Sequence, residues 1–139
     1  MLQKNDILTV TCDSIGTNGE GIARADGVLL FVPYFLTGVR ARYKVLKVKG
    51  STAYAKVEEL LTPAEDRLRP ACPVFARCGG CQLQHMAYRL QLRFKTALVR
   101  DTLKKLGGVT AEVSACERSE AEYGYRNKLQ LPIGTVNGK

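Results

Sequence analysis

The sequence contains no long apolar run, no signal peptide and no internal repeat. None of its apolar runs reaches the ~18 residues that a membrane-spanning helix requires. Its first ten residues, MLQKNDILTV, lack the apolar core of a secretory signal peptide. The 139 residues are enough for one ordinary domain or two small ones. We therefore expect a monomeric cytoplasmic protein without contact to a membrane.

A glycine-rich nucleotide loop after a strand is also lacking. Neither of the two glycine pairs is placed to form one, because Gly79-Gly80 lies between cysteines and Gly107-Gly108 stands where a helix would end. The loop that cradles the phosphates of a bound nucleotide in many α/β domains is thus absent. We expect no nucleotide-type cofactor to bind to this chain alone.

The charge balance is strongly positive. The chain has 21 Lys and Arg residues against 13 Asp and Glu residues, a net charge of +8, and its isoelectric point is about 9.4. A value above ~9 is typical of nucleic-acid binding, although a basic surface can also serve solubility alone. Residues 63–139 carry most of the excess, so the second half is the better candidate for binding RNA.

Residues 1–62 have the pattern of short strands. Alternating or short apolar runs occupy residues 6–16, 27–33, 38–50 and 51–61, with glycine-bearing turns between them. Four or five short strands within about sixty residues suit a small closed barrel better than an open sheet with long edges. The predicted fold class is mainly β, with a small OB-like barrel followed by a small α+β segment.

The second half begins with a predicted linker at residues 63–70, before a segment at 71–139. Residues 86–108 have no glycine or proline before Gly107 and predict a helix. Its apolar residues form two stripes, which predicts burial on two sides with a basic ridge between them. Residues 109–116 and 125–134 predict two further strands. The candidate RNA-binding side chains are the ridge and two positions of the last strand: Arg89, Arg93, Arg100, Lys104, Arg126 and Lys128.

Three of the five cysteines cluster in the stretch CPVFARCGGCQLQH, residues 72–85. Cys72, Cys78 and Cys81 have the spacing C-x5-C-x2-C, and thiols stay reduced in the cytoplasm, so metal binding is favoured over a disulfide. Three thiolates suit either zinc, with His85 as fourth ligand, or an iron–sulfur cluster completed by another cysteine. Spacing alone leaves the two open. The remaining cysteines, Cys12 and Cys116, are interpreted as a core residue and a bystander.

The cysteine stretch and the helix after it resemble the cluster-binding segment of the 23S ribosomal RNA (uracil-5-)-methyltransferases, including C-P-x4-C-G-G-C-Q-L-Q-H. Two further features agree. The G-x-G-I-A-R stretch beginning at Gly19 resembles a TRAM domain, and EYGYRNKLQLPIG resembles the Y-R-N-K strand of the same enzymes. The resemblance spans nearly the whole chain in the right order.

The resemblance implies a [4Fe–4S] cluster held by Cys72, Cys78 and Cys81, with a fourth family cysteine beyond residue 139. It also implies an enzyme that methylates uracil C5 from S-adenosylmethionine in a separate catalytic domain. No residue of this chain can be assigned a catalytic role, so this N-terminal portion alone is expected to be inactive. Its expected task is to bind RNA, with the cluster in a structural role.

A different class of protein is the alternative. A stand-alone RNA-binding module could use a zinc knuckle of three cysteines and His85 and have no enzymatic domain. Three aromatic residues of the barrel are candidates for stacking on RNA bases in either case, although a place in the core is favoured for each: Tyr34, Phe35 and Tyr43.

Overall fold

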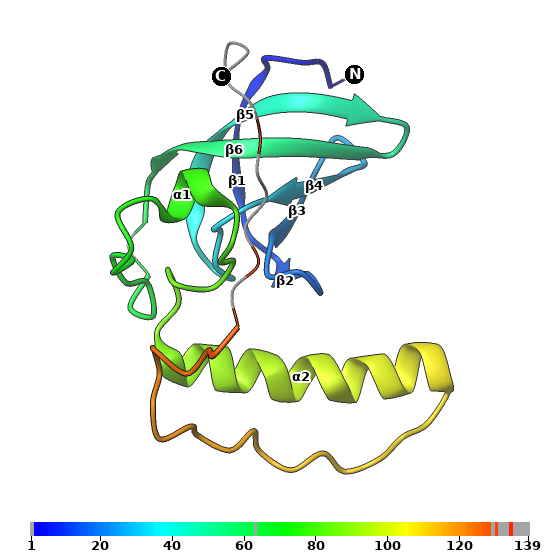
Figure 1. The fold of residues 1–139 in the computed structure, drawn as a ribbon. Coiled ribbons are helices and arrows are strands. Elements are labelled where there is room, and N and C mark those ends of the chain that lie inside the picture. The colour runs from blue at the N-terminus through cyan, green and yellow to red at the C-terminus, as the bar shows by residue number, and fades with distance from the viewer. Residues whose placement is uncertain (1, 63, 129, 131–133, 135–139) are drawn as a thin grey trace.

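The chain folds into a curled β-sheet, with two helices after it (Figure 1). The computed structural model describes residues 2–62, 64–128, 130 and 134. Six strands form one sheet in the order β1-β5-β6-β4-β3-β2. The strands are β1 (Ile7–Thr11), β2 (Ser14–Ile15), β3 (Gly21–Ala25), β4 (Val28–Val32), β5 (Arg40–Lys49) and β6 (Thr52–Leu60), and the helices are α1 (Phe75–Cys78) and α2 (Tyr88–Gly107). Within the described ranges, neither helix has the length and apolar character needed to cross a bilayer.

The sheet is curled (Figure 1), and its neighbouring strands are antiparallel except that β4 joins β6 in parallel. This arrangement forms a half-barrel, the name used below for residues 7–60. Ala41, Tyr43 and Val45 of β5 are fully buried, while Arg42 between the first two is exposed. The pairing of β5 with β6 is irregular between Val45 and Lys47, where Leu46 forms an extra position. The mainly β, OB-like fold class is therefore confirmed, as a half-barrel.

Strand β3 was not among the predicted strands, because its sequence follows a glycine-rich turn. Gly21 stands at its start, opposite Val32 of β4. A Cβ atom at Gly21 would lie 2.6 Å from Cβ of Phe35 and 2.7 Å from its carbonyl oxygen. Only glycine allows this close approach, so packing accounts for one glycine of the G-x-G-I-A-R stretch.

The core lies inside the half-barrel and contains two of the three aromatic residues proposed for base stacking. Phe35 and Tyr43 are both fully buried, with ring centroids 4.8 Å apart. The hydroxyl of Tyr43 donates a hydrogen bond to the carbonyl oxygen of Val10 at 3.3 Å. These rings are core residues, which is the interpretation that the sequence favours, and they cannot stack on RNA bases.

The segment predicted as a linker is fixed against the half-barrel. Ala64 packs on the core, and Arg67 forms an isolated β-bridge with Met86. The Arg67 guanidinium donates to the carbonyl oxygen of Tyr34 at 2.7 Å, and the Leu68 N–H donates to the carbonyl oxygen of His85 at 2.8 Å. Residues 64–68 thus hold the start of α2 beside the sheet.

Helix α2 ends where the glycine pair predicts. Gly108 adopts a left-handed conformation with φ of 64°, and its N–H donates to the carbonyl oxygen of Leu103. The predicted burial on two sides is wrong, since none of the α2 residues is buried. Leu90 packs against the core, whereas Leu106 on the other stripe is 85% exposed.

The segment after α2 runs back along this helix (Figure 1). The N–H of Cys116 donates to Oγ1 of Thr96 at 2.8 Å, which fixes the segment near the middle of α2. Residues 109–116 form no strand, contrary to the prediction, because they lie beside a helix and not beside a sheet edge. Residues 125–128 form no strand either, and the rest of that predicted strand lies mainly outside the described residues.

Candidate functional site

The three clustered cysteines occupy residues 72–85, the cysteine loop. Cys72 precedes α1 and Cys78 ends it, with Gly79 following in a left-handed conformation at φ 74°. Nothing lies within 4 Å of the place where a Cβ of Gly79 would stand. Cys78 and Cys81 are exposed and Cys72 is partly exposed. Their thiols are thus accessible to a metal ion or cluster.

Gln84 connects the two ends of the cysteine loop. Its Oε1 accepts a hydrogen bond from the N–H of Cys72 at 3.2 Å, and its Nε2 donates to Sγ of Cys81 at 3.2 Å. A donor to sulfur is one of the means by which proteins tune iron–sulfur ligands. Gln84 therefore links the backbone at Cys72 to the thiol of Cys81 and donates to one candidate ligand.

The cysteine loop is anchored on the half-barrel by three rings. Phe75 of α1 lies 4.6 Å from Tyr34 and 5.9 Å from His85, measured between ring centroids. His85 is 1% exposed, and neither of its ring nitrogens has a hydrogen-bond partner among the described residues. Burial, together with the nearby charge of Arg67, lowers the pKa of His85 to about 4. The imidazole is therefore neutral near pH 7.

The donor chemistry of the loop fits a thiolate-bound metal centre, but the side chains do not converge on one point. Within the described ranges, no three His, Cys, Asp or Glu side chains are close enough together to hold a metal ion. His85 lies against Tyr34 and Phe75 in the interior, whereas Cys78 and Cys81 are exposed. A zinc site with His85 as ligand would need this ring to leave its aromatic surroundings.

The other two cysteines lie in different surroundings. Cys12 is buried in the half-barrel, where desolvation raises the pKa of its thiol to about 11. Its Sγ donates to the carbonyl oxygen of Ser14 at 3.2 Å. Cys12 is therefore a protonated core thiol, as the sequence predicts, and Cys116 lies on the segment that runs along α2.

A groove of about 550 Å³ opens between the half-barrel and the cysteine loop. The half-barrel supplies the β2–β3 turn, the end of β4 and the middle of β6, and the cysteine loop supplies the other wall. Its lining residues are Asn18, Gly19, Glu20, Phe31, Pro33, Tyr34, Tyr54, Gly79, Cys81 and Gln82. The groove has the size of an ordinary small-ligand site.

Two aromatic rings in this groove were not among the predicted site residues. Phe31 of β4 and Tyr54 of β6 are directly paired in register, and their rings stack with centroids 5.8 Å apart. Tyr54 is 49% exposed. The sequence held a signal for it, because Ala53 and Ala55 face the core and alternation then places Tyr54 outside. Of the three predicted stacking residues, Tyr34 alone lines the groove.

The first two arginines of the predicted basic ridge form ion pairs with the preceding segment. Arg89 contacts Glu65 at 2.9 Å and also Asp66, and Arg93 contacts Asp66 at 3.2 Å. Both guanidinium groups remain more than half exposed. They thus fix α2 to residues 65–66 and still present N–H donors to solvent.

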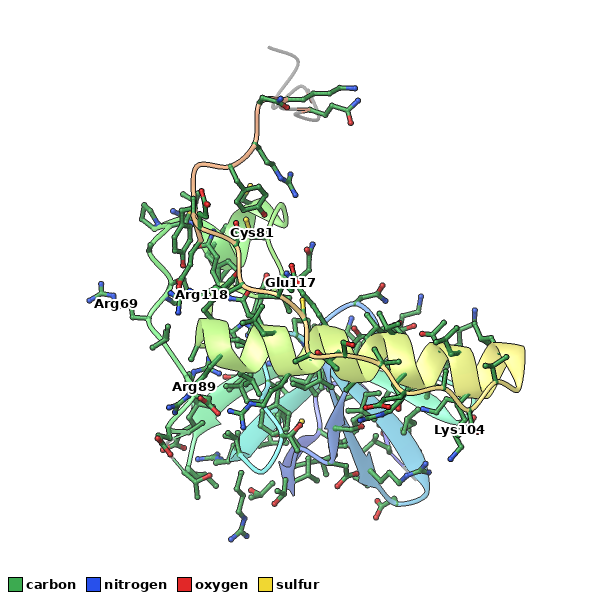
Figure 2. The ribbon with its side chains drawn as sticks, turned by 90° about the horizontal axis from the view of Figure 1, so that it is seen from below. Arg69, Cys81, Arg89, Lys104, Glu117 and Arg118 are labelled. Atoms are coloured by element: carbon green, nitrogen blue, oxygen red, sulfur yellow. The ribbon has the colours of Figure 1, made fainter. Side chains whose placement is uncertain are left out.

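The other predicted RNA-binding side chains lie apart from this pair. Lys104 stands at the far end of α2 from Arg89 (Figure 2), and Arg100 lies 3.7 Å from Asp101. Arg126 and Lys128 are exposed, and their segment shows no strand, so no common strand face unites them. Arg118, which was not predicted, lies over the ring of Tyr88 at 5.4 Å.

These features define a class: a small OB-like β domain that carries a cysteine loop and a basic helix. The chain is also similar to proteins named as RNA methyltransferases. The chain is 40% identical over 138 residues to an uncharacterized RNA methyltransferase of Clostridium tetani, covering 99% of this chain and 30% of that protein. It is 38% identical over 139 residues to one of Listeria monocytogenes, covering 100% of this chain and 31% of that protein.

A third relative, an uncharacterized RNA methyltransferase of Halalkalibacterium halodurans, is 41% identical over 99% of this chain and 30% of its own length. The chain therefore spans about 30% of the length of the curated relatives that it matches. The predicted resemblance to RNA methyltransferases is confirmed. Nearly the whole chain is similar to one part of each of these relatives.

Likeness to family models and solved structures is more limited. No protein-family model matches the chain. The solution structure of a conserved protein of Methanococcus maripaludis is 35% identical, with a TM-score of 0.39 over 41% of this chain and 81% of that chain. The fold class therefore rests on the sheet of this protein itself.

Proposed function

We propose that this chain is the RNA-binding and iron–sulfur portion of an S-adenosylmethionine-dependent methyltransferase that modifies uracil C5 in ribosomal RNA. The observation that carries the proposal is the packing of the cysteine loop on the half-barrel through Phe75 and Tyr34. Because of this contact, both parts line the same groove. Similarity to proteins named RNA methyltransferases along 99–100% of the chain supports it. So does the long C-P-x4-C-G-G-C-Q-L-Q-H motif.

The task of this portion follows from the chemistry of the target. A uracil inside folded RNA must leave its stack before its ring can be attacked. The surrounding RNA must be held meanwhile, and proteins hold it through phosphate contacts and by stacking unpaired bases on aromatic rings. The net charge of +8 and the aromatic groove supply both kinds of contact. Methyl transfer belongs to parts of the relatives that this chain does not span.

A [4Fe–4S] cluster would be held by Cys72, Cys78 and Cys81, together with a fourth thiolate from outside the described residues. When bound, it would cross-link the cysteine loop to a distant segment and brace a small domain with a limited core. Gln84 would hold Cys81 through its amide N–H, as it does in the present geometry. Phe75 would keep the loop on the half-barrel.

The alternative, a stand-alone RNA-binding module with a zinc knuckle, has no specific observation in its favour. It requires His85 as a ligand, and this ring is enclosed by Tyr34, Phe75 and the chain around Arg67. The two metal centres also differ in colour, since zinc is colourless and an iron–sulfur protein is brown.

Anaerobic reconstitution with iron and sulfide tests the metal assignment, and binding of ribosomal RNA fragments tests the partner. We expect a brown protein that contains iron and acid-labile sulfide but holds them weakly, because only three of the four proposed ligands are among its cysteines. We also expect an RNA affinity that falls with rising salt. Transfer RNA serves as the competitor that distinguishes the substrates. A colourless protein with stoichiometric zinc, or an equal affinity for transfer RNA, would contradict the corresponding part of the proposal.

A further inference from the structure

We propose that the groove between the half-barrel and the cysteine loop binds one unpaired nucleobase of single-stranded RNA, stacked on Tyr54. The inference rests on the proposed RNA binding and adds the site and the kind of RNA. It starts from the aromatic pair Phe31 and Tyr54, whose rings stack on the outer face of the sheet. Phe31 stacks against the ring of Tyr54 from the neighbouring strand β4 and so helps to hold this ring in position.

An exposed, supported tyrosine is suited to stacking because it offers a large flat apolar surface at little entropic cost. Tyr54 stands between two buried alanines, Ala53 and Ala55, so its backbone is fixed in the sheet. Nothing in the core requires a ring at this outward position. Its 49% exposure in a groove wall therefore indicates a surface for a planar ligand.

The groove has polar groups where the edge of a stacked base would lie. The cysteine loop contributes Gln82 to the lining of the groove, and the β2–β3 turn of the half-barrel contributes Asn18. Gln82 uses its Nε2 to donate to the carbonyl oxygen of Gly79 at 3.2 Å, which leaves its Oε1 for another donor. An amide carries both donor and acceptor groups and can pair with the Watson–Crick edge of a base.

A cation is placed for the phosphate of the same nucleotide. Lys47 of β5 is the direct cross-strand partner of Tyr54, so both side chains project from the same face with Cβ atoms roughly 5 Å apart. Lys47 is exposed and forms no ion pair within the described ranges. A base on Tyr54 and its phosphate on Lys47 would then bind together.

Double-stranded RNA does not fit this arrangement. Bases inside a duplex are paired and stacked on one another, so their faces cannot reach a ring on a sheet. The groove is also bounded by the close packing of Gly19 against Leu83, where a Cβ at Gly19 would lie 2.5 Å from Cδ2 of Leu83. The site therefore selects an unpaired nucleotide, such as one in a loop or beside an extruded uracil.

The test measures binding of an eight-nucleotide single-stranded RNA and of a duplex of the same length by fluorescence anisotropy. Tyr54→Ala should weaken single-strand binding by about 5- to 150-fold at constant salt, the range for loss of one stacked base. Its salt dependence should stay the same. Lys47→Ala should instead lower the slope of log affinity against log salt by ~0.7. Tyr54→Phe keeps the ring and should retain wild-type affinity.

Tyr123→Ala is the matched control, because Tyr123 is 56% exposed and does not line the groove. A second measurement needs no variant: ultraviolet cross-linking of the wild-type chain to RNA containing 4-thiouridine. Trypsin cleavage after Lys49 and Lys56 gives a peptide of residues 50–56 that contains Tyr54, and this peptide should carry the cross-link.

The possible outcomes separate the two proposals. If the wild-type chain binds neither RNA, the proposed RNA-binding function fails. If it binds RNA but Tyr54→Ala has wild-type affinity, or the cross-link avoids residues 50–56, the groove assignment is overturned and RNA binding stands. A duplex bound as tightly as the single strand would also overturn it.

Discussion

Gly19 of the β2–β3 turn and Leu83 of the cysteine loop are packed so closely that a Cβ atom at Gly19 would lie 2.5 Å from Cδ2 of Leu83. Gly19 also has a φ of 84°, in the left-handed region. This contact joins the glycine motif of the half-barrel to the cysteine motif, 64 positions later in the sequence. The two motifs are thus parts of one packing unit.

Gly19→Ala should therefore loosen the cysteine loop. The substitution strains the backbone by ~1–2 kcal/mol and also displaces Leu83. Gly27→Ala is the matched control, because Gly27 has a φ of 76° and nothing within 4 Å of its Cβ position. We expect urea unfolding to show a greater loss of stability for Gly19→Ala than for Gly27→Ala. Equal losses would mean that the contact with Leu83 contributes nothing.

The cysteine assignment is tested by serine variants and iron analysis after reconstitution. Cys78→Ser and Cys81→Ser should lose most of the bound iron and sulfide, because each removes a thiolate ligand. Cys12→Ser and Cys116→Ser should retain it, since Cys12 is a buried protonated thiol and Cys116 lies beside α2. Complete loss of iron in the Cys12 or Cys116 variant would refute the assignment.

The contribution of the basic ridge to RNA binding is tested by substituting Arg93 and its ion-pair partner Asp66. Arg93→Ala should weaken RNA binding and lower the salt slope by ~0.7, the value for one lost phosphate contact to a single strand. Asp66→Asn should strengthen RNA binding, because it removes a negative charge and releases Arg89 and Arg93. Arg42→Ala, which removes an exposed arginine paired with Glu59 on the sheet, is the control. Unchanged affinity and slope in Arg93→Ala would show that the ridge faces something other than RNA.

The buried His85 should make folding stability depend on pH. Its pKa is lowered to about 4 in the folded chain from an ordinary value of 6.5, so the unfolded chain binds more protons between these values. Stability contributed by the neutral ring is therefore complete above pH 6.5 and falls as the pH drops toward 4, by up to about 3 kcal/mol.

His85→Phe should remove this dependence, because phenylalanine does not titrate and fits among aromatic rings. Urea unfolding at pH ~7, ~5.5 and ~4.5 measures the difference between the two proteins, in which the contributions of the carboxylates cancel. The same loss of stability toward the lowest pH in both proteins would contradict a buried neutral His85.

The sequence by itself determined the local elements. Alternation at β1, β5 and β6 predicted strands because one face of each is buried in a core, and the Gly107-Gly108 pair predicted the end of α2 through its left-handed cap. The C-x5-C-x2-C spacing identified the cysteine loop, and the burial of Cys12 followed from its place in an apolar alternation.

Tertiary structure alone decided which of the predicted side chains meet. Phe35, which lies between β4 and β5, turned inward against Tyr43, a contact that the alternation of neither strand encodes. Asp66 bound Arg89 and Arg93, a pairing between residues 23 and 27 positions apart that no local pattern encodes. Residues 109–116 had a strand-like sequence but lay along a helix, since a strand forms only where another strand can supply its hydrogen bonds.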